Sequence, residues 1–290
     1  MHDIIVISII VIILLIILTS STLQNLIIKK LEDKQKRKLS KELSNSIKNK
    51  EFIIYIQPKF DTQTSELVGA EALIRKKLPN GEILPPNKFV PLYEKYGVIT
   101  KLDMYVLEEI CKKQKEWRNK NLKLIPISIN ESRHHLKNSN HLQELNNIIS
   151  KYDTNTNLIE LEMTESTVVE NMEIAKQAEE NVHKMGFIVS MDDFGTGYSA
   201  FNILKNIKID VLKIDKSFFD DMINNAKAQI IIETIVSMCK KLDIITVAEG
   251  IETKEQVEFL KKINCDRIQG YYFSKPIPIE LFEKTYLQKK

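Results

Sequence analysis

Apolar and polar residues follow three different patterns along the 290-residue chain. Residues 4–18 form an unbroken apolar run, and residues 19–28 continue it without a charge. Residues 29–50 are strongly charged. From residue 51 onward, short apolar runs alternate with longer charged stretches in which apolar residues recur at helical spacing. This pattern predicts a separate N-terminal segment followed by one large domain of alternating strands and helices.

The large domain contains eight strand candidates, separated by helical patterns such as residues 101–120 and 253–264. The candidates lie at residues 52–58, 67–75, 124–130, 158–165, 187–193, 211–215, 245–250 and 267–273. Eight strands with intervening helices in about 240 residues match the size of one (β/α)8 barrel. A doubly wound open sheet is the competing α/β architecture. We therefore predict an α/β fold with a TIM-like (β/α)8 barrel over residues 51–290.

Polar or charged side chains lie near the C-terminal ends of at least seven strand candidates. They are Glu71, Asn130, Glu162, Asp192, Lys213, Glu249 and Gln269. Strand residues alternate between two faces, so each of these side chains can share an inward face with its neighbours. A single Asp or Asn at such a position could be a helix cap, but seven converging polar groups are not explained by capping. Because the site of a TIM barrel lies at this end of the strands, we expect a functional site there.

Five carboxylates and one amide dominate the expected site: Glu71, Glu162, Asp192, Asp193, Glu249 and Asn130. Unpaired carboxylates this close together would repel each other and take up protons, so bound cations are expected. An all-oxygen set without His or Cys favours Mg²⁺ or Mn²⁺ over Zn²⁺. Five carboxylates exceed what one Mg²⁺ usually takes, so two ions are expected, an arrangement suited to phosphoryl chemistry. The adjacent Asp192 and Asp193 would then face different ions, or one of them would bridge both.

Four further residues are candidates for roles beside the carboxylates. Lys213 could position the attacking water or stabilise charge on a phosphate, and a structural ion pair with a carboxylate is the alternative. Arg75, four residues after Glu71, suits a bidentate grip on a phosphate. Gln57 and Gln269 could form hydrogen bonds with a substrate or cap strand ends.

Charge and hydropathy together predict the location of the protein. Residues 29–50 hold nine Lys or Arg and three Asp or Glu, a net charge of +6, while residues 51–290 hold 33 basic and 35 acidic residues. The nearly neutral domain is not expected to bind a DNA or RNA polymer. No Lys or Arg precedes the apolar run and no cleavage-site pattern follows it, so residues 1–28 are predicted to be a single membrane anchor helix. The basic segment after it, a juxtamembrane linker, places the domain in the cytoplasm. A buried core helix is the alternative.

Eight short motifs identify a resemblance to a known family. They are QPK (57–59), EALIR (71–75), SINES (128–132), LEMTES (161–166), MDDFGTGYSA (191–200), LKID (212–215), VAEGIE (247–252) and QGYYFSKP (269–276). With these motifs in order, residues 50–285 resemble the EAL domain, the bacterial cyclic di-GMP phosphodiesterase family. The resemblance implies a TIM-like barrel with an irregular first strand. It also implies hydrolysis of one phosphodiester bond of cyclic di-GMP to linear pGpG.

The resemblance implies roles for individual residues as well. The matching metal ligands are Glu71, Asn130, Glu162, Asp192, Asp193 and Glu249. Lys213 matches the lysine that orients the nucleophilic water, and Glu249 is also counted among the catalytic residues. Glu165 matches an acid that steadies the loop of residues 194–199, which the family links to metal binding and dimer coupling. Gln57, Arg75 and Gln269 match positions near the substrate. A homodimer through the barrel is therefore expected.

Two other functions remain open. An EAL-like domain can lose catalysis and act as a cyclic di-GMP receptor or interaction module, but the retained ligand set and Lys213 favour the active enzyme. Without the resemblance, another Mg²⁺-dependent barrel such as an enolase-like lyase would fit. The departures from the family pattern are small: Lys76 stands where Trp is frequent, and residues 198–201 read YSAF where YSSL is commoner.

Overall fold

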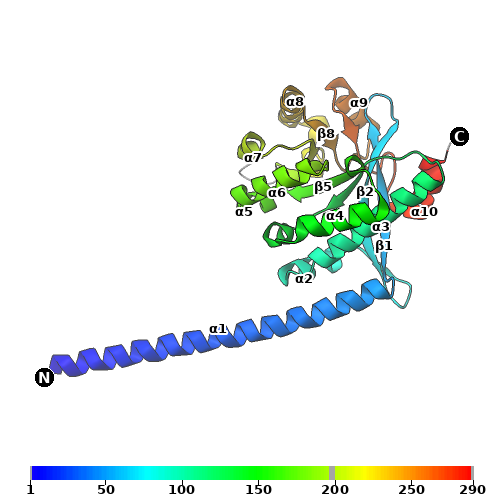
Figure 1. Ribbon diagram of the computed structural model, residues 1–290. Helices are drawn as coiled ribbons and strands as arrows, with labels where there is room; N and C mark the ends of the chain where they lie inside the picture. The colour runs from blue at the N-terminus through cyan, green and yellow to red at the C-terminus, as the bar shows by residue number, and fades with distance from the viewer. Residues whose placement is uncertain (1, 196–199, 289–290) are drawn as a thin grey trace.

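The computed structural model describes residues 2–195 and 200–288, without the side chains of residues 2–22, 137, 170 and 200. The strands are β1 (Phe52–Asp61), β2 (Leu67–Lys77), β3 (Ile83–Leu84), β4 (Ile127–Asn130), β5 (Ile159–Thr164), β6 (Ile188–Phe194), β7 (Val211–Ile214), β8 (Ile245–Ala248), β9 (Arg267–Ile268) and β10 (Ile277–Pro278). The helices are α1 (His2–Lys48), α2 (Val90–Lys95), α3 (Thr100–Asn119), α4 (His141–Tyr152), α5 (Glu165–Glu170), α6 (Met172–Lys184), α7 (Ala200–Asn206), α8 (Ala226–Lys241), α9 (Lys254–Lys262) and α10 (Ile279–Phe282). Helices surround the sheet, as Figure 1 shows.

Eight strands close into a barrel. Their order is β1-β9-β8-β7-β6-β5-β4-β2, and β2 pairs back with β1. Neighbouring strands from β2 through β9 run parallel. β1 is antiparallel to both β2 and β9, whereas an ordinary TIM barrel is parallel throughout. The predicted TIM-like barrel is therefore confirmed, and its first strand is the irregular one.

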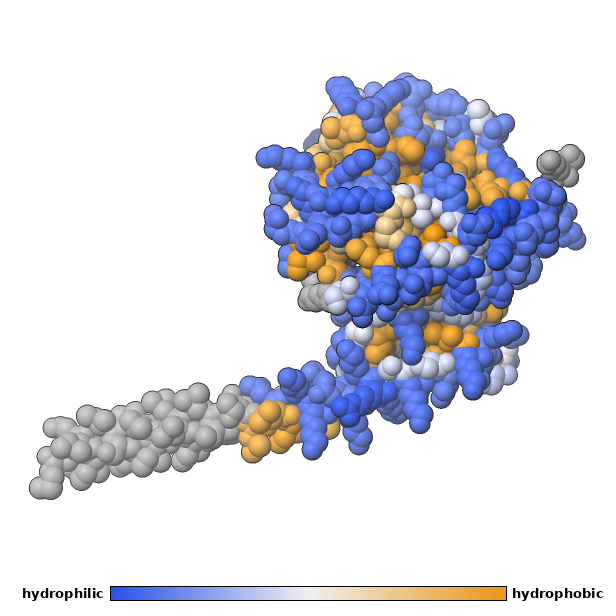
Figure 2. Space-filling model, in the orientation of Figure 1, coloured by the Kyte–Doolittle hydropathy of each residue, from blue (hydrophilic) through white to orange (hydrophobic). Residues whose placement is uncertain are grey.

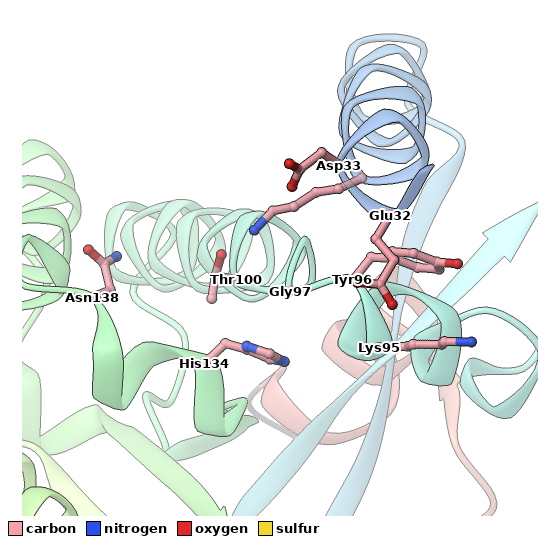
Figure 3. A pocket seen from close by; sticks show the side chains of 9 residues that line it. Glu32, Asp33, Lys95, Tyr96, Gly97, Thr100, His134 and Asn138 are labelled. Atoms are coloured by element: carbon pink, nitrogen blue, oxygen red, sulfur yellow. The ribbon is translucent and has the colours of Figure 1, made fainter. Parts of the chain in front are cut away.

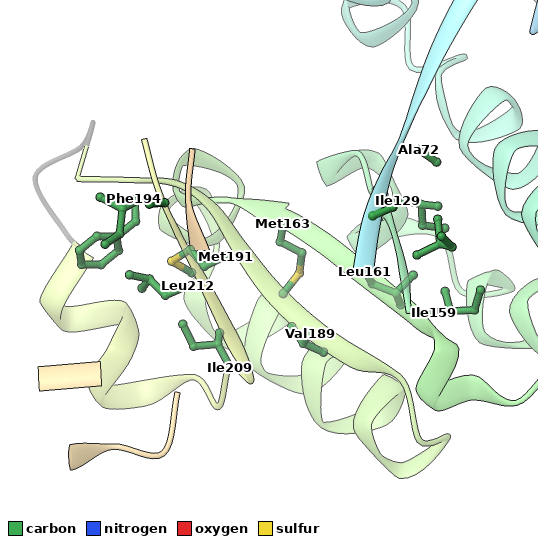
Figure 4. Close-up of a cluster of buried hydrophobic side chains, with 14 of the residues drawn as sticks. Ala72, Ile129, Ile159, Leu161, Met163, Val189, Met191, Phe194, Ile209 and Leu212 are labelled. Carbon is green, nitrogen blue, oxygen red and sulfur yellow. The ribbon is translucent and has the colours of Figure 1, made fainter. Parts of the chain in front are cut away.

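The strand alternation divides polar from apolar side chains as expected. In β5, Ile159, Leu161 and Met163 belong to the main apolar cluster between the sheet and the helices, which Figure 4 shows in part. Glu160 and Glu162, the residues between them, are also buried but contact lysines instead. Because successive residues point to opposite faces, the acidic pair faces the inside of the barrel. The core is thus apolar outside the sheet and partly ionic inside it.

The C-terminal part of α1 packs against the barrel, whereas the apolar side chains of residues 23–31 are exposed. Leu39 and Leu43 are buried in a second apolar cluster with side chains of β1, α2 and α3. Residues 23–31 instead expose Leu23, Leu26, Ile27, Ile28 and Leu31 by 51–64%. Figure 2 shows these apolar residues as a patch on the described part of α1, while most of the visible barrel surface is polar.

Most of the predicted membrane anchor, residues 1–28, lies outside the residues whose side chains are described. Among the residues whose side chains are described, no helix is long and apolar enough to cross a membrane. The apolar run of residues 4–18 lies outside those residues. Residues 29–48 of the predicted linker belong to α1, the helix that also carries the buried Leu39 and Leu43.

Candidate active site

The ammonium group of Lys213, on β7, lies among four carboxylates at the C-terminal ends of the strands. Its Nζ is 2.9 Å from Asp192 Oδ1 and 2.9 Å from Glu249 Oε1. It is also 3.1 Å from Glu162 Oε2 and 3.8 Å from Glu71 Oε2. The four acids come from β2, β5, β6 and the residue after β8. The convergence predicted from strand ends is therefore found, and the ion-pair alternative for Lys213 is observed with each acid.

An irregularity in β6 explains how two adjacent aspartates fit beside one site. Between Met191 and Phe194, β6 has one residue more than the facing stretch of β7. Asp193 has a φ angle of +54°, a left-handed conformation that is uncommon for residues other than glycine. This β-bulge breaks the strand alternation. Asp192 keeps the inward face expected from alternation and reaches Lys213, while Asp193 is exposed and donates its backbone N–H to Asp192 Oδ1 at 3.0 Å.

Three amide side chains extend the carboxylate cluster. Asn130 donates from Nδ2 to Glu71 Oε1 at 3.4 Å, and Gln269 donates from Nε2 to Glu71 Oε2 at 2.5 Å. The same Gln269 nitrogen lies 3.1 Å from Gln57 Oε1. Gln57 in turn donates to the carbonyl of Ser274 at 3.2 Å. The structure thus brings Asn130, Gln57 and Gln269 together with Glu71.

Arg75 is placed differently from the other candidates. Its guanidinium donates to the carbonyl of Ile74 at 2.9 Å and stacks over the ring of Tyr55, 5.4 Å from the centroid. None of the described ion pairs joins it to a carboxylate of the cluster. Half-burial lowers the pKa of Arg75, but the group keeps its charge at neutral pH. Arg75 therefore lies on the same strand as Glu71 without contacting the ionic centre.

Lys59 is a functional-site residue that the sequence reasoning missed. Its side chain is 1% exposed, and its ammonium donates to Ser128 Oγ at 2.8 Å, Glu160 Oε1 at 3.0 Å and Glu162 Oε1 at 3.2 Å. A signal was available, because Lys59 is two residues beyond Gln57 and shares its face of β1. Glu162 therefore contacts one lysine through each carboxylate oxygen.

The electrostatics of the cluster separate two kinds of carboxylate. Burial opposes ionisation of Glu162, but Lys213 and Lys59 outweigh it and lower the pKa of Glu162 to about 2. Burial raises the pKa of Glu249 to about 8. The charges of Asp192 and Glu71 also raise it, and the charge of Lys213 lowers it. Burial likewise raises the pKa of Glu71. One lysine therefore does not neutralise the cluster, and the acids left over hold protons when no further cation is bound.

Glu165 lies where the resemblance suggests, at the start of α5 and next to the loop that follows β6. Its Oε2 accepts a hydrogen bond from the backbone N–H of Gly195 at 3.2 Å. Gly195 has a φ angle of +92°, and a Cβ atom there would lie 2.4 Å from Cζ of Phe218. Only glycine fits this position without displacing Phe218. Residues 196–199 of the loop lie outside the described residues.

Two cavities lie near the ends of the barrel strands and α1. One, of about 530 Å³, is lined by residues of β2, α3 and the segment after β4, including Glu71, Asn130, Asp103 and Glu131. The other, also about 530 Å³, lies between α1 and the segment from α2 to α3. Figure 3 shows His134 and Thr100 at this second cavity, opposite Asp33 of α1. The first cavity borders the carboxylate cluster, and the second does not.

Comparison with known proteins decides the family. Residues 40–276 match the family model described as the EAL domain. The chain belongs to the EAL domain family. Among curated relatives of this EAL domain, the signalling protein YkoW of Bacillus subtilis is 34% identical over 259 residues, covering 89% of this chain and 32% of YkoW. The cyclic di-GMP phosphodiesterase PdeR of Escherichia coli is 31% identical over 248 residues, covering 86% of this chain and 37% of PdeR.

Solved structures agree with the family and with the fold. The PaMucR phosphodiesterase in its c-di-GMP complex superimposes on this EAL domain with a TM-score of 0.78 at 30% identity, covering 84% of this chain and 99% of that chain. The chain spans about a third of the length of the curated relatives it matches. The EAL domain is thus the part that these larger proteins share with it.

Proposed function

We propose that this EAL domain hydrolyses one phosphodiester bond of cyclic di-GMP and releases linear pGpG. The observation that carries the proposal is the convergence of Glu71, Glu162, Asp192 and Glu249 on Lys213 at the C-terminal mouth of the barrel. The naming of PdeR as a cyclic di-GMP phosphodiesterase and the ligand of the PaMucR complex support cyclic di-GMP as the substrate.

The donor set fits divalent cations, and Mg²⁺ or Mn²⁺ are the proposed cofactors, with two ions per site. The proposed ligands are Glu71, Asn130, Glu162, Asp192, Asp193 and Glu249. All of them offer oxygen atoms, and burial together with the neighbouring carboxylates raises the pKa values of Glu71 and Glu249, so a bound cation would stabilise their ionised forms. When bound, such cations supply Lewis-acid activation of water and of the phosphate.

The remaining candidates act through hydrogen bonds and charge. Lys213 would orient the attacking water through an Nζ–H group and stabilise negative charge that develops on the phosphate. Gln57 and Gln269, already joined to Glu71, would bind the substrate beside the reacting bond. Glu165 would hold the loop after β6 through Gly195, which keeps Asp193 in place. Arg75 would bind the substrate outside the ionic centre.

Membrane attachment and homodimerisation belong to the same proposal. The apolar run of residues 4–18 and the basic segment after it support an anchor at the cytoplasmic membrane with the barrel in the cytoplasm. A dimer would form through the barrel near the loop of residues 194–199. Detergent partitioning of the purified full chain would measure membrane attachment, and light scattering would measure its oligomeric state.

A cleavage assay with matched variants tests the proposed reaction. Wild type, Glu249→Gln and Glu252→Gln are incubated with cyclic di-GMP and Mg²⁺, and products are separated by chromatography. Glu252 serves as the control because it is exposed and pairs with Lys216 outside the cluster. The expected result is pGpG from wild type and Glu252→Gln, with little from Glu249→Gln. Binding of cyclic di-GMP without cleavage by wild type would instead identify a receptor.

A further inference from the structure

A second cluster of ionisable side chains lies at the connection between β4 and α4. Glu131 directly follows β4, His135 lies in a 3₁₀ turn (Arg133–Lys137), and His141 begins α4. One donor atom from each of the three lies within 4.8 Å of the others. Among the described residues, no other group of three or more His, Cys, Asp or Glu has this property. The cluster shares no residue with the carboxylates around Lys213.

Both histidines are buried with unused nitrogen atoms. His135 is 3% exposed and His141 is 6% exposed, and their rings lie 4.2 Å apart. The Nδ1 atom of each ring has no hydrogen-bond partner. Buried polar atoms are normally paired, so two unpaired ring nitrogens beside a carboxylate require an explanation. A cation bound by Nδ1 of His135 and by Nε2 of His141, which also has no hydrogen-bond partner, provides one.

Neighbouring carboxylates orient the two rings. Asp103 of α3 places Oδ2 3.1 Å from His135 Nε2 and accepts the backbone N–H of Ser132 at 3.2 Å. When Nε2 carries the proton toward Asp103, Nδ1 is left with a free lone pair. At protein metal sites, the second ring nitrogen of a metal-binding histidine usually donates its hydrogen to a carboxylate, a backbone carbonyl or a water. His141 Nε2 lies 2.5 Å from Glu131 Oε1, so an ion bound by both atoms would move them slightly apart.

We propose that Glu131, His135 and His141 bind one divalent transition-metal ion of the Zn²⁺ type, with Asp103 as the positioning residue for His135. Two imidazole nitrogens and a carboxylate oxygen suit Zn²⁺, whereas Mg²⁺ prefers oxygen ligands alone. The first cavity reaches Asp103 and Glu131, which gives an ion a path from solvent. The bound ion ties together α3, the end of β4 and the start of α4. It thereby fixes the backbone next to Asn130.

Metal titration of the full chain tests the site independently of turnover. The protein carries Glu71→Gln and Asp192→Asn, so that the carboxylates around Lys213 no longer compete, and it is freed of metal by a chelator. We expect Zn²⁺, measured against a chromophoric competitor, to bind at about one ion per chain, and Co²⁺ to give visible d–d absorption. No saturable binding of either ion would overturn the proposal. Protons shared between the rings and carboxylates would then be the occupants.

Variants assign the ion to these residues. In the same background, His135→Gln with His141→Gln should lose the Co²⁺ absorption, and Asp103→Asn should weaken Zn²⁺ binding about 10–100-fold. His134→Gln is the matched control, because His134 lies in the same turn but donates from Nε2 to the carbonyl of Glu94, at the second cavity. It should keep full binding. Glu131→Gln serves as a second variant if circular dichroism shows the double variant unfolded. Unchanged binding in a folded His141 or Glu131 variant would contradict the site.

Discussion

The Nζ atom of Lys213 lies 3.1 Å from Oε2 of Glu162, and both side chains are almost completely buried. On the other side of the same carboxylate, Lys59 lies 3.2 Å from Oε1. Glu162 is thus held ionised by two lysines, one at the proposed site and one deeper in the barrel. Burial raises the pKa values of Glu71 and Glu249 beside it, against the charge of Lys213, so added positive charge would stabilise their ionised forms.

The first prediction concerns Lys59. Lys59→Met should lower the free energy of unfolding by about 3–5 kcal/mol, because it leaves Glu160 and Glu162 buried beside fewer positive charges. Adding Glu160→Gln should recover part of this loss, since one of the two acids is then neutral. Urea denaturation gives both values. The exposed Lys38→Met should change stability by less than about 0.5 kcal/mol, and the same small effect at Lys59 would contradict the ion-pair account.

The second prediction concerns Glu71. Glu71→Ala should abolish measurable turnover. This loss is larger than the roughly 10–100-fold loss caused by mutating a residue that hydrogen-bonds to a metal ligand. The barrel should stay folded, because Glu71 is held by amide hydrogen bonds and by the ammonium of Lys213 rather than by apolar packing. Steady-state kinetics and thermal unfolding check the two parts. Glu82→Ala, an exposed glutamate of the β2–β3 turn, is the control and should turn over normally. Activity kept in Glu71→Ala would refute the proposed ligand set.

The third prediction concerns pH. In the metal-free folded protein Glu249 keeps its proton up to about pH 8, whereas a glutamate in an unfolded chain loses it near pH 4.3. The folded state therefore binds more protons in this window, and its stability falls as pH rises, by at most about 1.4 kcal/mol per pH unit. The difference between wild type and Glu249→Gln in chelator isolates this effect. Parallel stability curves for the two proteins between pH 5 and pH 8 would show that Glu249 is not the group responsible.

The fourth prediction concerns α1. Deleting residues 1–28 should leave a soluble and active domain, because the deletion ends before Leu39 and Leu43. Deleting residues 1–50 removes both leucines, and each fully buried leucine contributes about 2–5 kcal/mol. Thermal unfolding of the two truncated chains should therefore differ strongly. If the shorter deletion already abolishes folding, residues 1–28 are part of the core and not an anchor.

The sequence predicts the barrel well because its strands follow a clear pattern of apolar runs. It predicts strand limits less well: β1 extends to Asp61, past the expected residue 58, and β9 ends at Ile268 instead of continuing to residue 273. After Ile268 the chain turns at Gly270, where a Cβ atom would lie 2.1 Å from the carbonyl oxygen of Ile251. Such a close approach depends on a distant segment, which a local pattern does not contain.

Site residues at strand ends were predictable, because alternation and chain order are enough to bring them together. The position of Asp193 was not, since alternation alone would send it away from Asp192, and the β-bulge that changes this is a tertiary feature. Lys59 shares a face of β1 with Gln57, but its partners Glu160 and Glu162 are about 100 residues away in the sequence, and a local pattern does not identify them. His135 and His141 are six residues apart on two elements, a spacing that matches no helical metal motif.

The most direct test of the central claim follows cyclic di-GMP cleavage by the wild-type chain while the divalent cation is removed and restored. The account predicts pGpG formation with Mg²⁺ or Mn²⁺, no product in excess chelator, and recovery when the cation is returned. Cleavage that persists in chelator would contradict a metal site at the carboxylates around Lys213. Tight binding with no cleavage under any cation would contradict the phosphodiesterase itself.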